Sequence, residues 1–171
     1  MAIRSAAKAI ILRDNKVLVN RCKAYGTGEV YYDLPGGGQN QFETMEEAVI
    51  REVLEETGHH VEIVRFVALA EEIYLDKKLR NEYFDYTHRV LHIFLVKLVG
   101  SKQQEPSEID FQQEESVWLN LKDANHMPFH PKSLTGNLVK LVNGPYPVYL
   151  GNEYILRYNL SILIALGSTR Q

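Results

Sequence analysis

The sequence predicts an α/β fold in which a mixed β-sheet is packed between helices. Short apolar runs with the two-residue period of strands occur early and late in the chain, and helical patterns lie between and after them. The composition is 45% hydrophobic and 24% charged over 171 residues, which is typical of one globular domain whose core is large enough to fold alone. We therefore expect a single domain over residues 1–171.

The first elements along the chain are expected to be a hairpin and a loop. Apolar runs at residues 9–12 and 17–19 flank Asp14 and Asn15, which favour a tight turn between two strands. Residues 26–42 contain six glycines or prolines, so regular structure is disfavoured and we predict a loop.

A helix over residues 45–57 is the clearest element of the sequence. Thr44 and Glu47 have the spacing of a capping box, and Gly58 is a typical C-terminal stop. Apolar residues at helical spacing between these two ends give the helix one side that can pack on a sheet.

The second half of the chain predicts more strands and a second helix. Residues 61–69 and 89–99 alternate with the period of strands, residues 100–115 are polar and are expected to form a loop, and residues 117–119 form a short strand. After Pro131, four apolar residues are spaced as on one side of a helix: Leu134, Leu138, Leu141 and Val142. We expect residues 144–171 to be a C-terminal extension, with aromatic and aliphatic residues that favour further strand.

Charge and composition exclude several classes of function. With 19 Lys and Arg against 22 Asp and Glu, the net charge of −3 leaves no basic excess for a nucleic-acid polymer. The most apolar segment, residues 160–166, is too short to cross a bilayer, and the first residues lack the pattern of a signal peptide. Cys22 is the only cysteine, so neither an internal disulfide nor a thiolate metal cage is expected. We expect a cytoplasmic protein that does not bind membranes.

Three glutamates in the predicted helix point to a metal site. Glu52, Glu55 and Glu56 stand at i, i+3 and i+4, so their carboxylates share one edge of the helix. Their mutual repulsion and their position near the negative helix end together cost about 1 kcal/mol. A bound divalent cation would reverse this cost, and a set of oxygen ligands suits Mg²⁺ or Mn²⁺ better than zinc.

The glycine run before this helix indicates phosphate chemistry. Gly36, Gly37 and Gly38 have no side chains, so the backbone can approach a ligand closely. Proteins usually bind Mg²⁺ through one or two carboxylates together with phosphates of the substrate. In such a site the cation neutralises diphosphate oxygens while a glutamate takes a proton from the attacking water.

The same residues form a known pattern. The segment GGQNQFETMEEAVIREVLEETGH, residues 37–59, resembles the Nudix box GX5EX7REUXEEXGU of the Nudix hydrolases, where U is a bulky aliphatic residue. His59 departs from the pattern, because it stands where an aliphatic residue is expected. The matching positions are Gly37, Glu43, Arg51, Glu52, Val53, Glu55, Glu56 and Gly58.

The resemblance implies a Nudix-type α/β/α sandwich that hydrolyses nucleoside diphosphates linked to another moiety, with Mg²⁺ or Mn²⁺ as cofactor. It implies that Glu52, Glu55 and Glu56 bind the metal together with a backbone carbonyl of Gly36 or Gly37. Glu52 or Glu55 would activate the water, and Arg51 would complete the catalytic set. Glu43 and Gly58 would have structural roles, and Glu43 would pair with Arg51. The helix geometry equally allows Arg51 to reach Glu55 at i+4. A later loop would add an acidic ligand, for which Glu114 or Glu115 is the candidate.

The residues that bind the rest of the nucleotide are less strongly indicated. Gly38, Tyr74 and Arg80 are candidates, because the segment of residues 74–86 mixes aromatic and basic side chains that can stack on a base and neutralise phosphate. Core packing with an ordinary polar loop would give the same pattern. The sequence does not identify which nucleotide is the substrate. A homodimer is possible. The alternative function is a non-catalytic Nudix-fold module that senses a nucleotide without cleaving it.

Overall fold

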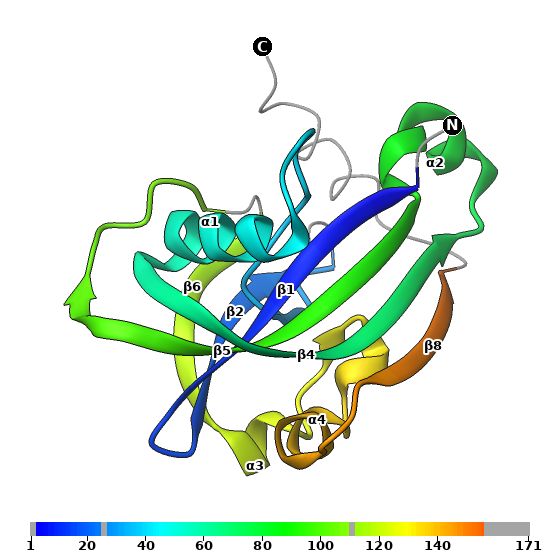
Figure 1. The fold of residues 1–171 in the computed structure, drawn as a ribbon. Coiled ribbons are helices and arrows are strands. Elements are labelled where there is room, and N and C mark those ends of the chain that lie inside the picture. Colours follow the sequence, from blue (N-terminus) through cyan, green and yellow to red (C-terminus); the bar gives the residue numbers. More distant parts are fainter. Residues whose placement is uncertain (1–2, 25–26, 110–111, 156–171) are drawn as a thin grey trace.

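The computed structural model describes residues 3–24, 27–109 and 112–155 (Figure 1). The strands of this part are β1 (Arg4–Arg13), β2 (Lys16–Lys23), β3 (Val30–Asp33), β4 (His59–Tyr74), β5 (His88–Gln103), β6 (Gln113–Asn120), β7 (Phe129–His130) and β8 (Val148–Ile155). The α-helices are α1 (Met45–Thr57), α2 (Lys77–Glu82), α3 (Leu121–Ala124) and α4 (Leu138–Asn143).

The strands form one mixed sheet, as predicted. Its order is β7-β3-β2-β1-β5-β4-β8, with β6 paired to β2. β1 is antiparallel to β2 and parallel to β5, and β5 is antiparallel to β4. Figure 1 shows β1, β5 and β4 side by side through the middle of the molecule. The predicted hairpin is the β1–β2 pair, and its turn residues Asp14 and Asn15 have positive φ angles of 48° and 61°.

Helices cover both faces of the sheet and complete an α/β/α sandwich. α1 packs on one face, where Val49 and Val53 join a buried cluster with Ala9 of β1. The neighbouring residue Ile10 points to the other face and packs with Leu138 of α4, because successive strand residues face opposite sides. α1 and α4 accordingly lie on opposite sides of the sheet (Figure 1).

Local signals at both ends fix α1 at the predicted bounds. The Thr44 side chain accepts a hydrogen bond from the backbone N–H of Glu47, and the Glu47 carboxylate accepts one from Thr44 N–H. At the other end Gly58 has a left-handed φ of 69°, and a Cβ there would overlap the Gln104 carbonyl. Only glycine suits both demands, so the helix ends at Thr57.

Loss of the N-terminal cap should weaken the fold measurably. We expect Thr44→Ala to lower the free energy of unfolding by about 1 kcal/mol, because the Glu47 N–H loses its acceptor. Urea unfolding followed by circular dichroism measures the change. Thr44→Ser keeps the hydroxyl and should stay close to the wild type; equal losses in both variants would contradict the capping role.

The structure corrects three sequence-based boundaries. Residues 26–42 were expected to form a loop, but residues 30–33 form β3, which pairs with β2 and β7. Its four residues have intermediate exposure and no apolar alternation, so the strand depends on its two neighbours. The loop at 100–115 is shorter than expected, because β5 continues to Gln103 and β6 begins at Gln113. The predicted second helix begins only at Leu138; Leu134 belongs to a preceding 3₁₀ turn.

The expected C-terminal extension is described only in part. β8 adds a strand to β4 at the edge of the sheet, which agrees with the strand tendency of residues 144–155. Residues 156–171 lie outside the described residues, together with the apolar segment 160–166. Within the described ranges, no helix has the length and apolar character needed to cross a membrane.

Candidate active site

The glycine loop lies against β1 as an additional strand-like segment. Ala9 N–H donates to the Pro35 carbonyl at 2.8 Å, and Ala7 N–H donates to the Gly37 carbonyl at 2.9 Å. β2 pairs only with the last residues of β1, so the first half of β1 has this edge available for the loop. The loop between β3 and α1 therefore has a fixed position next to the sheet.

Two glycines of this loop lie where a side chain does not fit. Gly36 has a φ of 130°, and a Cβ there would overlap the Ala7 carbonyl of β1. A Cβ on Gly37 would lie 2.6 Å from Cδ of Glu52. The backbone at this point lies in contact with β1 on one side and with a carboxylate of α1 on the other.

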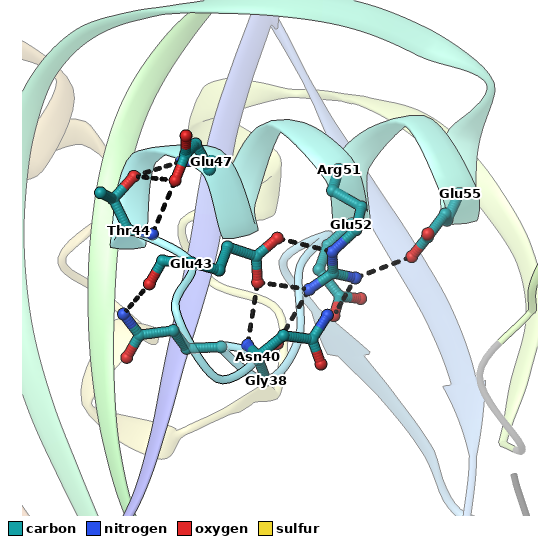
Figure 2. Close-up of polar contacts among 9 residues, drawn as sticks. Gly38, Asn40, Glu43, Thr44, Glu47, Arg51, Glu52 and Glu55 are labelled. Atoms are coloured by element: carbon teal, nitrogen blue, oxygen red, sulfur yellow. Dashed lines mark hydrogen bonds and ion pairs between the residues drawn. The ribbon is translucent and has the colours of Figure 1, made fainter. Parts of the chain in front are cut away.

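Arg51 connects the loop to three carboxylates (Figure 2). Its guanidinium donates to both oxygens of Glu43, through Nε at 2.7 Å and Nη2 at 2.9 Å. Nη1 donates to Glu52 and to Glu55, each at 2.9 Å, and Nη2 also donates to the Gly38 carbonyl at 3.0 Å. The two pairings that the sequence left open, with Glu43 and with Glu55, thus occur together.

The network shifts the proton affinities of its members in opposite directions. The hydrogen bonds from Arg51 hold the pKa of Glu43 below its ordinary value of 4.5. Burial raises the pKa of Glu52, although Arg51 acts in the opposite direction. The carboxylate of Glu43 in turn raises the pKa of Arg51, so the guanidinium stays charged. Glu43 is thus a structural anion, whereas Glu52 is a more basic carboxylate.

The shifted pKa of Glu43 predicts a pH-dependent contribution to stability. A carboxylate whose native pKa is lowered stabilises the fold above its unfolded pKa, and this contribution is lost as the pH falls through the native pKa. Glu43→Gln should therefore cost about 1 kcal/mol at neutral pH, and this difference from the wild type should shrink below pH 4.5. Urea unfolding between about pH 3 and pH 7 measures it. The exposed Glu62, paired with Lys97, provides the control Glu62→Gln, which should change little at any pH.

Glu56 has a different environment from the other two glutamates. Its side chain is buried, and Oε2 accepts hydrogen bonds from Asn20 Nδ2 at 2.9 Å and from Gly36 N–H at 3.0 Å. Asn20 is held by the hydroxyl of Ser116, which donates to Asn20 Oδ1 at 2.8 Å. Glu56 thus ties the helix to the glycine loop and to β2.

The donors at this site fit a hard divalent cation. Glu52 and Glu55 each place an oxygen 2.9 Å from Arg51 Nη1, so one cationic group already lies between them. Carboxylate and carbonyl oxygens are the ligands that Mg²⁺ and Mn²⁺ prefer. Over the described ranges, no group of three His, Cys, Asp or Glu side chains is placed to hold a metal ion together, and Glu56 is engaged with Asn20 and Gly36. A cation would thus meet two converging carboxylates first.

A cavity of about 330 Å³ opens in front of these carboxylates. Its lining includes the three glycines with Asn40, Arg51, Glu52 and Glu55. It also includes residues that the sequence did not indicate, chiefly Arg4 and Lys8 of β1 and Arg89 of β5. The signal that could have found them is a charged residue within a strand of small and apolar residues: Lys8 stands between Ala7 and Ala9, and it is buried.

The expected acidic ligand from the later loop does not reach this cavity. Glu114 is paired with Arg21, and its side chain is 40% exposed. Glu115 is the register partner of Arg21 in the β2–β6 pair. Glu108 lines the cavity instead, and its N–H donates to the Glu55 carbonyl at 3.1 Å. The acidic residue of this region that lines the cavity therefore precedes the predicted one.

Of the three residues expected to bind the rest of the substrate, only Gly38 lines the cavity. Tyr74 is 1% exposed at the end of β4, where it packs in a cluster with Ile155. Arg80 uses Nε to donate to the Tyr74 carbonyl, which attaches α2 to the end of β4. For Tyr74 and Arg80 the structure thus agrees with the packing alternative that the sequence left open.

The one departure from the box pattern is accommodated by packing. His59 is buried at the start of β4, with its ring 6.1 Å from that of Trp118 in an edge contact. Burial lowers the pKa of His59, so the neutral ring takes the place of an aliphatic side chain.

A comparison with protein families identifies the family of this chain. The model of the NUDIX domain matches residues 2–136. The chain belongs to the Nudix hydrolase family. Nudix hydrolases generally cleave nucleoside diphosphates linked to another moiety, which agrees with the carboxylates and the glycine loop described above. No curated protein matches the sequence.

Solved structures confirm the Nudix fold. A Nudix hydrolase from Nitrosomonas europaea is 20% identical with a TM-score of 0.64, covering 90% of this chain and 80% of its own. An ADP-ribose pyrophosphatase from Streptococcus suis is 18% identical with a TM-score of 0.58, and the match covers 89% of this chain and 100% of the other. A UDP-X diphosphatase is 18% identical with a TM-score of 0.61, and the match covers 90% of this chain and 68% of the other. At these identities the likeness concerns the fold alone.

Proposed function

We propose that this Nudix protein hydrolyses the diphosphate bond of a nucleoside diphosphate linked to another moiety, with Mg²⁺ or Mn²⁺ as cofactor. The observation that carries the proposal is the convergence of Glu52 and Glu55 on a single cationic nitrogen, 2.9 Å from each, at the wall of a cavity that the glycine loop also lines. Two acidic side chains directed at one point beside glycine backbone that lines the cavity suit a cation that carries phosphate oxygens.

The positions of the residues support the following roles. Glu52 and Glu55, joined by Glu56 and by a carbonyl of Gly36 or Gly37, would hold the metal. When bound, a divalent ion would neutralise the oxygens of the diphosphate and favour ionisation of a water molecule. Glu52, whose pKa burial raises, or Glu55 takes the proton of the attacking water. Arg51 holds both carboxylates in position and fixes the loop through the Gly38 carbonyl.

A panel of nucleotides with product identification tests this function. The panel holds nucleoside triphosphates with damaged bases, ADP-ribose, sugar nucleotides and dinucleoside polyphosphates, each with Mg²⁺, with Mn²⁺ and with EDTA. We expect metal-dependent release of a nucleoside monophosphate from at least one class. Tight binding without turnover under either metal would overturn the proposed hydrolysis and favour the nucleotide-sensing alternative.

A further inference from the structure

Two arginines occupy adjacent positions on the cavity wall formed by β1 and β5. Arg4 and Arg89 are register partners in this parallel pair, and both line the cavity. The next partners on the same face, Ala6 and Leu91, line it too and carry no charge. Neighbouring strands are about 4.8 Å apart, so like charges in register repel each other. Such a pair is stabilised when an anion binds between its members.

The surroundings of each arginine keep its guanidinium at the cavity. Arg89 forms an ion pair with Glu72, whose side chain is 1% exposed. The Arg4 guanidinium carbon lies 4.6 Å from the centre of the Tyr86 ring, and Tyr86 also lines the cavity. Both contacts restrict flexible side chains before any ligand binds, which lowers the entropy cost of binding.

The glycine loop is in direct contact with the arginine pair. A Cβ on Gly38 would overlap the guanidinium of Arg4, so this glycine lets the arginine lie against the loop backbone. The same loop touches Glu52 through Gly37. One short backbone segment therefore joins the carboxylate end of the cavity to the arginine end.

Lys8 is a third basic side chain that lines the cavity. Lys8 lies on the same face of β1 as Arg4, four residues further, which is about 13 Å between the Cα atoms. Its ammonium donates to Asp33 at 2.9 Å, and its charge lowers the pKa of Glu52, although burial dominates that shift. Asp33 and Glu108 also line the cavity. A substrate in this cavity thus has the carboxylates, Lys8 and the two arginines around it.

We propose that Arg4 and Arg89 bind the terminal phosphoryl group of a polyphosphate, so that the enzyme prefers nucleoside triphosphates to nucleoside diphosphates that end in a neutral sugar. The inference rests on the proposed function, because it places the cleaved bond at the carboxylates. A terminal phosphoryl group offers several charged oxygens, which two guanidiniums bind in a bidentate manner. A neutral sugar at the same place offers the two guanidiniums no charged oxygens.

The test measures binding and not turnover. Titration calorimetry with Mg²⁺ compares an α,β-methylene nucleoside triphosphate with the matching α,β-methylene nucleoside diphosphate, neither of which can be cleaved between the α and β phosphates. In the wild type the triphosphate analogue should bind at least about tenfold more tightly. Arg4→Gln should reduce this ratio to about threefold or less, and Arg4→Lys should restore part of it.

Matched variants separate this binding role from an effect on folding. Arg13 lies on the same strand and also stacks on an aromatic ring, 4.5 Å from the centre of Trp118, but it does not line the cavity. Arg13→Gln should keep the wild-type ratio, and thermal unfolding checks that each variant is folded. Equal losses for both analogues in Arg4→Gln, or a wild-type ratio near one, would overturn the inference.

The same measurements distinguish this inference from the proposed function. If no nucleotide of the panel is cleaved but the affinity ratio depends on Arg4, the phosphoryl site stands and the proposed hydrolysis fails. If nucleotides are cleaved but the two analogues bind equally, the hydrolysis stands and the assignment of the arginine pair fails.

Discussion

Replacement of Glu55 by glutamine should lower kcat by about 10²- to 10³-fold while the protein stays folded. Glu55 is one of the two carboxylates that converge on a single cation, and glutamine removes the negative charge with little change of shape. Its side chain is 30% exposed, so the variant leaves no deeply buried group without a partner. Steady-state kinetics with the best substrate of the panel, together with thermal unfolding, measure both effects.

The same helix offers a matched control for this variant. Glu46 lies in the first turn of α1, is exposed and does not line the cavity. Glu46→Gln should keep the wild-type kcat within about twofold, because surface charges away from a site have small effects. If Glu55→Gln were as active as Glu46→Gln, Glu55 would have no role in the reaction.

Glu56→Gln should also lose activity, but the reason for its loss is harder to isolate. The Glu56 carboxylate accepts two hydrogen bonds in a buried place, from Asn20 and from Gly36 N–H. Only one end of the glutamine amide accepts hydrogen bonds, and its other end donates. The position of the glycine loop therefore changes together with the charge, which is why Glu55 gives the sharper test.

Local signals explain which parts of the fold the sequence predicts well. The bounds of α1 depend on a capping box at Thr44 and a left-handed Gly58, both of which act within a few residues of the helix ends. The hairpin depends in the same way on Asp14 and Asn15.

Spacing also explains why Glu52 and Glu55 lie on one side of α1, since residues three and four apart are neighbours on a helix. Spacing groups Glu56 with them as well, but Glu56 is buried against Asn20 and Gly36.

The rest of the site depends on contacts between segments that are far apart in the sequence. Such contacts leave no local pattern from which a single sequence predicts them. Arg4 and Arg89 lie side by side only because β1 and β5 pair in parallel with one particular register. β3 is a strand because β2 and β7 flank it. Tyr74 is a residue type that can stack on a nucleotide base, but its side chain is packed in a buried cluster. Register and long-range pairing therefore decide which candidates reach the cavity.

Arg51→Met should destabilise the metal-free protein by about 2–3 kcal/mol. The change leaves Glu43, Glu52 and Glu55 without their shared donor. Loss of one partner from a buried charge network costs about 3–5 kcal/mol, and the 28% exposure of the Arg51 side chain reduces this cost. Urea unfolding in EDTA measures the difference. Arg65 offers a comparison, because its guanidinium donates to carbonyls of α4 and not to carboxylates.

Added Mg²⁺ should then stabilise Arg51→Met more than the wild type. In the wild type a cation that approaches Glu52 and Glu55 competes with Arg51 Nη1 for the same two oxygens, whereas in the variant it meets two carboxylates that repel each other. A ligand that binds only the native state raises Tm with its concentration, and the rise is larger for the tighter site. Thermal unfolding over a range of Mg²⁺ concentrations compares the wild type, Arg51→Met and Arg65→Met. Equal shifts in all three would mean that the metal does not share the position of the Arg51 guanidinium, and the convergence of Glu52 and Glu55 would then serve the fold alone.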